Sequence, residues 1–365
     1  MNPTIDSNLA NSQVHQFSLG VQHDFGGFVV KARYVGTKSN YLPRSRMLNL
    51  IANPPAPATS VADETARLAQ FTAANAGATG NSVVRSNRLD PRFNTVNFID
   101  SSANSNFHSA QFELQRRLSR DLLFLAAYTV GKSIDDNSDV QGVLINDSFN
   151  QQNPRNNRDN RAVSQFDLPQ RLVMTHVWQL PFFKGVSNPA ARQFLHGWSF
   201  AGITSFRSGF PVTLESGARR GVATPAMTGI LNGPVRPNAA GSFVFNPVPA
   251  GSAGSPSTQN TDVQRISTYA ASLGLSQPLL GNFGGLGRNT HRLNGETNFD
   301  WNIYKDFPLG RESGVKLQFR TELYNVFNDT SFQDVNRNIS AATFGQYTTV
   351  AQNSRLLQMA LRLVF

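Results

Sequence analysis

Histidines and clustered carboxylates are the residues of this chain best suited to bind a metal or to move a proton. The chain has six histidines: His15, His23, His108, His176, His196 and His291. None stands in a His-x-x-x-His or His-Glu-x-x-His spacing, so the sequence does not favour a zinc site. We expect His176 to pack on an apolar strand face and His291 to lie in a solvated loop, with ligand contact as the alternative for His291.

Residues 135–139 (DDNSD) offer clustered oxygen atoms of the kind that calcium accepts. The cluster lacks the glycine and the final glutamate of an EF-hand loop. We therefore expect a solvated loop, with a bound cation as the alternative.

Two further segments are rich in polar or small residues. Residues 150–161 (NQQNPRNNRDNR) combine amide and guanidinium donors and could line a vestibule for a polar solute, but an exposed hydrophilic loop is the favoured interpretation. Residues 281–289 (GNFGGLGRN) match a glycine-rich phosphate loop in neither spacing nor context. We expect them to form a tight loop before a strand.

Catalytic motifs are hard to find in this sequence. It contains no cysteine and no Gly-x-Ser-x-Gly motif, and Glu113 has no evident carboxylate partner at acid-base spacing. We therefore expect neither an enzyme nor a bound cofactor.

The composition points to a surface that avoids charge. Charged residues make up 15% of the 365 residues, whereas a soluble domain usually carries about 25%. A strand face that meets lipid has a reason to avoid charge, because arginine or lysine at mid-bilayer costs roughly 2 to 4 kcal/mol. The formal net charge is +10, but no basic run or basic helix suits nucleic acid. Phosphate-rich lipopolysaccharide is the more plausible partner.

Period-two alternation of apolar and polar residues is the organising pattern of the chain. It recurs in about nine segments, within residues 13–25, 28–34, 110–118, 122–130, 166–180, 198–212, 298–303, 315–323 and 357–365. No stretch of about 18 apolar residues is present, so we expect strands and no membrane-spanning helix.

The connections between these segments alternate between short and long. The shorter ones are residues 26–27, 119–121, 310–314 and 181–197, and the long ones are residues 38–104, 135–165, 213–297 and 328–342. We expect a short helix at residues 61–74 and surface loops in the rest of the long connections. Short turns on one side and long loops on the other are typical of an outer-membrane barrel, with periplasmic turns and extracellular loops.

The predicted fold is all-β: a partial antiparallel transmembrane β-barrel, about nine strands of a larger one, integral to the outer membrane of a Gram-negative cell. Residues 1–365 would form the C-terminal part of the barrel domain, because nine strands that end in the periplasm must begin outside. The first residues, MNPTID, do not form a signal peptide. The polar residues predicted to face the lumen are Lys31, Arg33, Glu113, Arg117, Arg320 and Glu322.

The sequence resembles the C-terminal barrel of TonB-dependent outer-membrane receptors, and most closely their Oar-like branch. The segments that carry the resemblance are YVGT at 34–37, QRRLS at 115–119, YTVGKSIDD at 128–136, LPF at 180–182, SGFP at 208–211, GRNT at 287–290, FRTELYNVFN at 319–328 and the closing residues 355–365. The resemblance implies import of a scarce, bulky solute through a barrel whose plug domain moves when a periplasmic TonB-type energy-coupling protein pulls on it. The plug and the coupling segment are absent from this sequence, so the chain alone should not transport.

The end of the chain also resembles the signal by which the barrel-assembly machinery recognises such proteins. Gln358, Ala360, Leu363 and Phe365 occupy its polar, small, hydrophobic and terminal aromatic positions. Ala360 stands where glycine is usual, and Leu363 where an aromatic residue is common. The resemblance implies that this signal is weaker than average.

Two other functions remain open at this point. One is an outer-membrane adhesion or binding barrel without transport, which a plug and coupling segment upstream would exclude. The other is a secreted soluble β-rich binding protein, which salt alone would extract from cells.

Arg320 and Glu322 provide a first test, because both are predicted to face the lumen, where they could pair with neighbours or with the plug. Replacing both by alanine in the full-length protein should alter plug contact or increase ion leak, as measured by conductance across a planar bilayer. Unchanged leak would count against a lumenal role.

Overall fold

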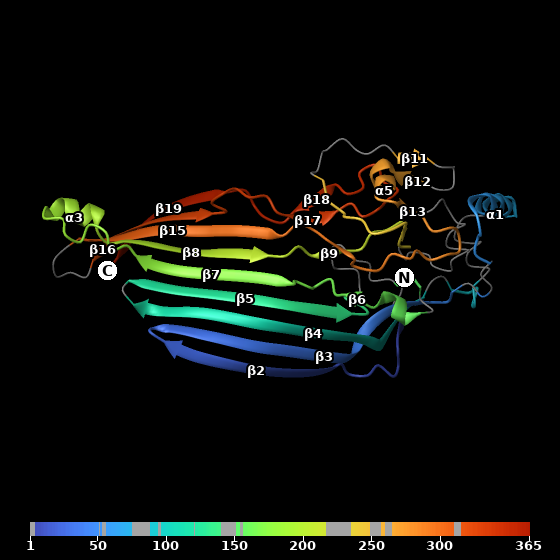
Figure 1. Ribbon diagram of the computed structural model, residues 1–365, viewed down its shortest axis with the longest axis horizontal. Coiled ribbons are helices and arrows are strands. Elements are labelled where there is room, and N and C mark those ends of the chain that lie inside the picture. Colours follow the sequence, from blue (N-terminus) through green and yellow to red (C-terminus); the bar gives the residue numbers. More distant parts are fainter. Residues whose placement is uncertain are drawn as a thin grey trace.

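One large sheet of long, mainly antiparallel strands forms the body of the molecule (Figure 1). Nine strands follow the order β19-β16-β15-β8-β7-β5-β4-β3-β2, so each pairs with strands adjacent to it in the chain or separated from it only by loop strands. Their bounds are β2 Gln13–Phe25, β3 Phe28–Leu48, β4 Val96–Ser119, β5 Leu122–Asp135, β7 Gln170–Gln179, β8 Trp198–Arg207, β15 Glu296–Pro308, β16 Lys316–Tyr324 and β19 Leu356–Val364. The all-β prediction and the nine alternating segments are confirmed.

The computed structural model describes residues 4–50, 52, 56–74, 88–93, 96–119, 121–139, 151–153, 156–216, 235–248, 257–259, 265–309 and 315–365. Two short strands also join the sheet, β1 (Thr4–Ile5) beside β4 and β6 (Ala162–Val163) beside β5. The other elements are α1 Val61–Ala74, η1 Asn157–Asn160, α3 Pro189–Leu195, β9 Pro211–Val212, β10 Asn238–Ala239, β11 Ser257–Gln259, β12 Arg265–Ser267, α5 Thr268–Ser272, β13 Leu275–Ser276, β14 His291–Arg292, β17 Phe332–Val335 and β18 Tyr347–Val350. None of the described helices is long and apolar enough to cross a membrane.

The strand register gathers the apolar residues on one face of the sheet. Ala126 of β5 stands opposite Leu114 of β4 and Met174 of β7. At the other edge, Leu323 of β16 stands opposite Trp301 of β15 and, on its other side, Leu357 of β19. We call this the apolar face. The residues that alternate with these along each strand point to the opposite side and form the polar face. The predicted lumenal residues that the structure describes lie on the polar face.

The sheet does not close on itself. β2 and β19 end the strand order and do not pair with each other. A strand edge leaves unpaired N–H and C=O groups, which lipid cannot satisfy. The sheet is therefore a partial barrel.

Short and long connections lie at opposite ends of the sheet (Figure 1), which we call the short-turn end and the long-loop end. Gly26 and Gly27 make the first short turn with φ values of 60° and 85°, the left-handed conformation that a two-residue hairpin requires. The second turn includes Asp121, with φ 68°. The predicted turn at residues 310–314 lies outside the described residues.

β3 and β4 extend far beyond their predicted ends. A loop was expected over residues 38–104, whereas β3 runs to Leu48 and β4 starts at Val96. The added part begins at a register shift near Ser39, and it pairs Arg44 with Asp100. That boundary was wrong because strands that continue into water need no apolar alternation. The helix predicted within the loop is confirmed as α1 (Val61–Ala74).

The long connections pack around a hydrophobic core of their own, which we call the loop assembly. Its core residues are Val212, Leu214, Phe245, Ala270, Leu275, Leu293, Val335, Ile339, Phe344 and Tyr347. These residues come from two connections, between β8 and β15 and between β16 and β19, and share no period that sequence analysis could detect. The expectation of surface loops was therefore wrong for these segments.

Two adjacent alanines of β5 test which face meets lipid. Ala126 lies on the apolar face, whereas Ala127 lies on the polar face opposite Glu113. Ala126→Arg should destabilise the membrane-inserted protein by about 2 to 4 kcal/mol, and Ala127→Arg should have an effect near zero. Denaturant unfolding in lipid vesicles measures both. Equal losses from the two variants would contradict the assignment of the faces.

Candidate functional site

The polar face carries ion pairs between neighbouring strands. Lys31 Nζ lies 2.6 Å from Glu113 Oε1, and Lys316 Nζ lies 2.5 Å from Asp306 Oδ2. Both pairs are partly exposed, so each contributes little stability. They supply a hydrophilic wall of balanced charge, which suits the inside of a barrel.

The polar face also brings Arg320 and Glu322 together. An Arg320 guanidinium nitrogen lies 3.4 Å from Glu322 Oε1, and the Tyr324 hydroxyl donates to Glu322 at 3.0 Å. Across the ladder, Arg320 stands opposite Ala360 and Glu322 opposite Gln358. Two positions of the predicted assembly signal therefore adjoin the two predicted lumenal residues.

The other two positions of the predicted signal lie elsewhere. Leu363 stands opposite Leu317 on the apolar face, and Phe365 is 96% exposed just beyond β19. The role of all four residues stays a prediction. The side chain of Arg117, also predicted to face the lumen, lies outside the described residues.

A hollow of about 120 Å³ opens on the polar face between β3, β4 and β5. Its polar lining comes from Lys31, Arg33, Gln111, Glu113 and Thr129. The lining thus combines charges of both signs with an amide group, and Glu113 is the single carboxylate among these residues.

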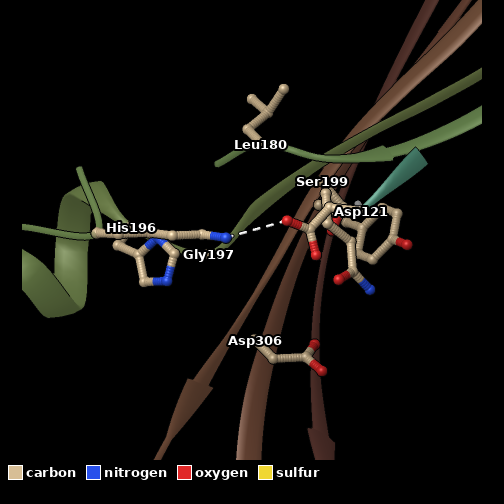
Figure 2. Close-up of a pocket in the computed structure, with 9 residues that line it drawn as sticks. Asp121, Leu180, His196, Gly197, Ser199 and Asp306 are labelled. Carbon is tan, nitrogen blue, oxygen red and sulfur yellow. Dashed lines mark hydrogen bonds and ion pairs between the residues drawn. The ribbon is translucent and has the colours of Figure 1, made fainter. Parts of the chain in front are cut away.

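A larger cavity, of about 350 Å³, lies at the short-turn end (Figure 2). It is lined by Asp121, Gln179, Leu180, Lys184, His196, Gly197, Ser199, Tyr304 and Asp306. The Lys184 ammonium lies 3.0 Å from Asp121, while Asp306 accepts from Lys316 and Gln318 on the neighbouring strand. Both carboxylates are thus neutralised by lysines, which leaves neither as a free acid or base.

Buried arginines fasten the loop assembly to the ends of the strands. Arg288, 3% exposed, forms an ion pair with Asp135 at the end of β5 and donates to the Asn160 carbonyl. Arg292, whose side chain is partly exposed, forms an ion pair with the buried Asp167. A buried arginine with a carboxylate and a carbonyl as acceptors holds loops in a fixed position.

The acidic cluster at residues 135–139 is part of this fastening. Asp135 also accepts from Ser138 Oγ at 2.7 Å, and Asp136 lies 2.8 Å from the Arg44 guanidinium. Asp135 is 4% exposed, so the expectation of a solvated loop was wrong. Within the described residues, no three histidine, cysteine, aspartate or glutamate side chains gather as metal ligands.

The polar segment at residues 150–161 is also packed inward. Gln152 is 2% exposed, accepts from the Arg236 backbone at 2.6 Å and donates to the Gly284 carbonyl at 3.1 Å. A Cβ on Gly284 would lie 1.7 Å from the Arg236 carbonyl oxygen, so only glycine fits there. The exposed loop predicted at 150–161 was wrong for its buried residues, whereas the tight loop predicted before β14 is confirmed.

The two singled-out histidines are both packed against aromatic rings. The His176 ring centroid lies 4.7 Å from that of Phe200, which confirms the expected packing on the apolar face. The His291 ring lies 4.5 Å from Phe243 in the loop assembly, and burial lowers the pKa of His291. The expected solvated position of His291 was wrong, and its surroundings favour the neutral ring.

Sequence analysis missed Arg236, Arg288 and Arg292 as structural residues. Their partners are Asp159, Asp135 and Asp167, more than 70 positions away along the chain. The only signal in the sequence was the occurrence of arginines in glycine-rich loops, which does not identify a partner.

The buried Arg288–Asp135 pair yields a second prediction. Arg288→Ala leaves the Asp135 carboxylate buried without its cation, which should cost about 3 to 5 kcal/mol of local stability. Hydrogen exchange of residues 287–293 measures the loss. The matched control is Arg92→Ala, which removes an exposed partner of Asp90 and should cost less than about 1 kcal/mol. Adding Asp135→Asn to Arg288→Ala should restore part of the protection, and no difference between Arg288→Ala and the control would contradict the anchoring role.

Comparison with solved structures finds distant similarity over almost the whole chain. The outer membrane transporter YddB from Escherichia coli matches with a TM-score of 0.47 and 10% identity, over 97% of this chain and 33% of that one. The copper transporter OprC matches with a TM-score of 0.39 and 7% identity, over 97% and 32%. FpvAI, solved in complex with pyocin S2, matches with a TM-score of 0.39 and 9% identity, over 96% and 27%.

The chain thus spans about a third or less of the length of these proteins. No curated protein matches it. The family model described as "Outer membrane beta barrel domain" matches residues 2–358, nearly the full sequence. With its open antiparallel sheet and its two contrasting faces, the chain belongs to the outer membrane β-barrel domain family and is an integral protein of the outer membrane.

Proposed function

We propose that this chain is the C-terminal part of the barrel of a TonB-dependent receptor of the Oar-like branch, which imports a bulky, scarce solute. The observation that carries the proposal is an open sheet whose polar face bears paired charges. Beyond one end of this sheet, the loop assembly packs around its own hydrophobic core. An open sheet needs further strands to satisfy its edges in lipid. Nine strands form only part of the wall that would enclose a plug.

The paired charges on the polar face support a filled lumen. Lys31 with Glu113 and Arg320 with Glu322 leave a surface that is hydrophilic but nearly balanced in charge. Such a surface can meet the polar exterior of a plug domain without a large desolvation penalty from unpaired ions. Solute recognition would fall to the loop assembly, because loops held by buried arginines present a preformed surface to the outside.

The proposal also names the partners of the complete protein. They are lipid and lipopolysaccharide around the apolar face, the barrel-assembly machinery, and a TonB-type protein that would act through a segment preceding the barrel. The chain's outer-membrane location speaks against the secreted soluble alternative. An adhesion or binding barrel remains the competing function, because a loop assembly with its own hydrophobic core would suit adhesion or binding equally well.

The test begins with the genomic sequence upstream of Met1. We expect a signal peptide, a plug domain and further alternating strands in the same reading frame. The complete protein in a planar bilayer should then conduct little current, and deletion of its plug should open a large conductance. An upstream gap with its own promoter and ribosome site, or equal conductance with and without the plug, would contradict the transport proposal.

A further inference from the structure

A histidine ring packs against the core of the loop assembly, which lies beyond one end of the sheet (Figure 1). The His291 ring centroid lies 4.5 Å from that of Phe243 and 5.9 Å from that of Phe245. Phe245 in turn packs against Phe344, which belongs to the connection between β16 and β19. The ring therefore lies beside the junction of the two connections that build this core.

One ring nitrogen of His291 lacks a partner. Its Nε2 atom is buried and has no hydrogen bond within the part of the chain that the structure describes. A neutral imidazole can leave one nitrogen as an unbonded acceptor, whereas a protonated ring makes both nitrogens donors. Protonation would thus place an unbonded cationic N–H in an aromatic core, and a cation–π contact with Phe243 recovers only part of that cost.

The described elements packed on this ring offer no charge that could offset the cost. β9 pairs with β14 and places Val212 opposite His291, and residues 243–245 are two phenylalanines and a valine. α5 and β18 contribute the phenols Tyr269 and Tyr347 to the same core. Burial is accordingly the one cause that lowers the pKa of His291. The folded loop assembly favours the neutral ring.

His291 stands between the two arginines that fasten the loop assembly to the sheet. Arg288 forms an ion pair with Asp135, and Arg292 forms one with Asp167. β14 itself is held to β9 by two residue pairs only. A displacement of His291 therefore acts on both ion pairs, and little sheet structure resists it.

Asp334 of β17 also responds to pH in this assembly, but with the opposite sign. Burial raises the pKa of the Asp334 carboxyl. A carboxyl whose pKa is raised by folding contributes stability at low pH that is lost as the pH rises. Asp334 therefore cannot cause a loss of order on acidification.

We propose that protonation of His291 is an acid switch that opens the loop assembly, so that the long-loop end is ordered at neutral pH and loosened at mildly acidic pH. The sign follows from linkage. A histidine whose pKa is lowered by folding contributes stability that is complete above its ordinary pKa of about 6.5 and is lost as the pH falls below that value. The proposal rests on the loop assembly and not on transport, so a failure of the plug or conductance tests would leave it standing.

Amide hydrogen exchange of the full-length protein in lipid vesicles tests the opening. After correction for the intrinsic pH dependence of exchange, protection of residues 265–276 and 335–347 should fall between pH 6.5 and pH 5.5. The uptake of one proton limits the fall to about tenfold per pH unit. β5, which crosses the membrane, should keep its protection. Equal protection of the loop assembly at pH 7.5 and pH 5.5 would overturn the switch.

His291→Phe removes the titratable group and keeps an aromatic ring beside Phe243. Protection of the loop assembly in this variant should be the same at both pH values. The matched control is His176→Phe, because the His176 ring also packs on an aromatic ring, that of Phe200, but on the apolar face of the sheet. This control should retain the loss of protection in acid. A loss that persists in His291→Phe, or that disappears equally in the control, would assign the effect to another group and overturn the proposal.

Exchange of the imidazole C2 hydrogen reports protonation of His291 in the unmodified protein, so this measurement does not depend on the folding of a variant. Protonation of the ring and loss of amide protection at residues 265–276 should begin together, below about pH 6.5. A ring that becomes protonated while these amides stay protected would show that the core accepts the charge. That result would overturn the switch, as would a loss of protection while the ring is still neutral.

Discussion

Backbone hydrogen bonding in a medium without water is the constraint on which this molecule depends. Lipid offers no partner for an N–H or C=O group, so a chain that crosses it with strands must pair each strand on both sides. The continuous ladder from β2 to β19 meets this demand inside the sheet and leaves it unmet at the two edges. The contrast between the faces follows from the same ladder, because successive side chains of a paired strand must point in opposite directions.

Where the chain leaves the lipid, a different balance applies. Water can satisfy exposed backbone groups, so the long connections are free to form short strands, helices and turns around their own apolar core. Such a core is small, and buried ion pairs complete it. Arg288 with Asp135 joins a loop to the end of β5, so the position of the loop assembly is set by the same strand that crosses the membrane.

These two regimes explain what the sequence could predict. Alternation located the nine strands because lipid imposes one apolar and one polar face on each of them. It gave the wrong ends for β3 and β4, where Arg44 stands opposite Asp100 in the strand register and no apolar face is needed. The candidate site residues differ in the same respect. Alternation along β16 predicted that Arg320 and Glu322 share a face, whereas the partner of Asp135 stands 153 positions away and no local pattern points to it.

Different interactions hold the connections in place at the two ends of the sheet. At the long-loop end, the buried Arg288–Asp135 pair and the partly exposed Arg292–Asp167 pair hold the loops near the ends of the strands. At the short-turn end, Phe182 packs edge-on against Trp178 and Phe194 lies against Phe307, while both phenylalanines stay more than half exposed. The long loops are thus held by side-chain ion pairs, whereas the first two short turns follow directly from the pairing of the strands they join.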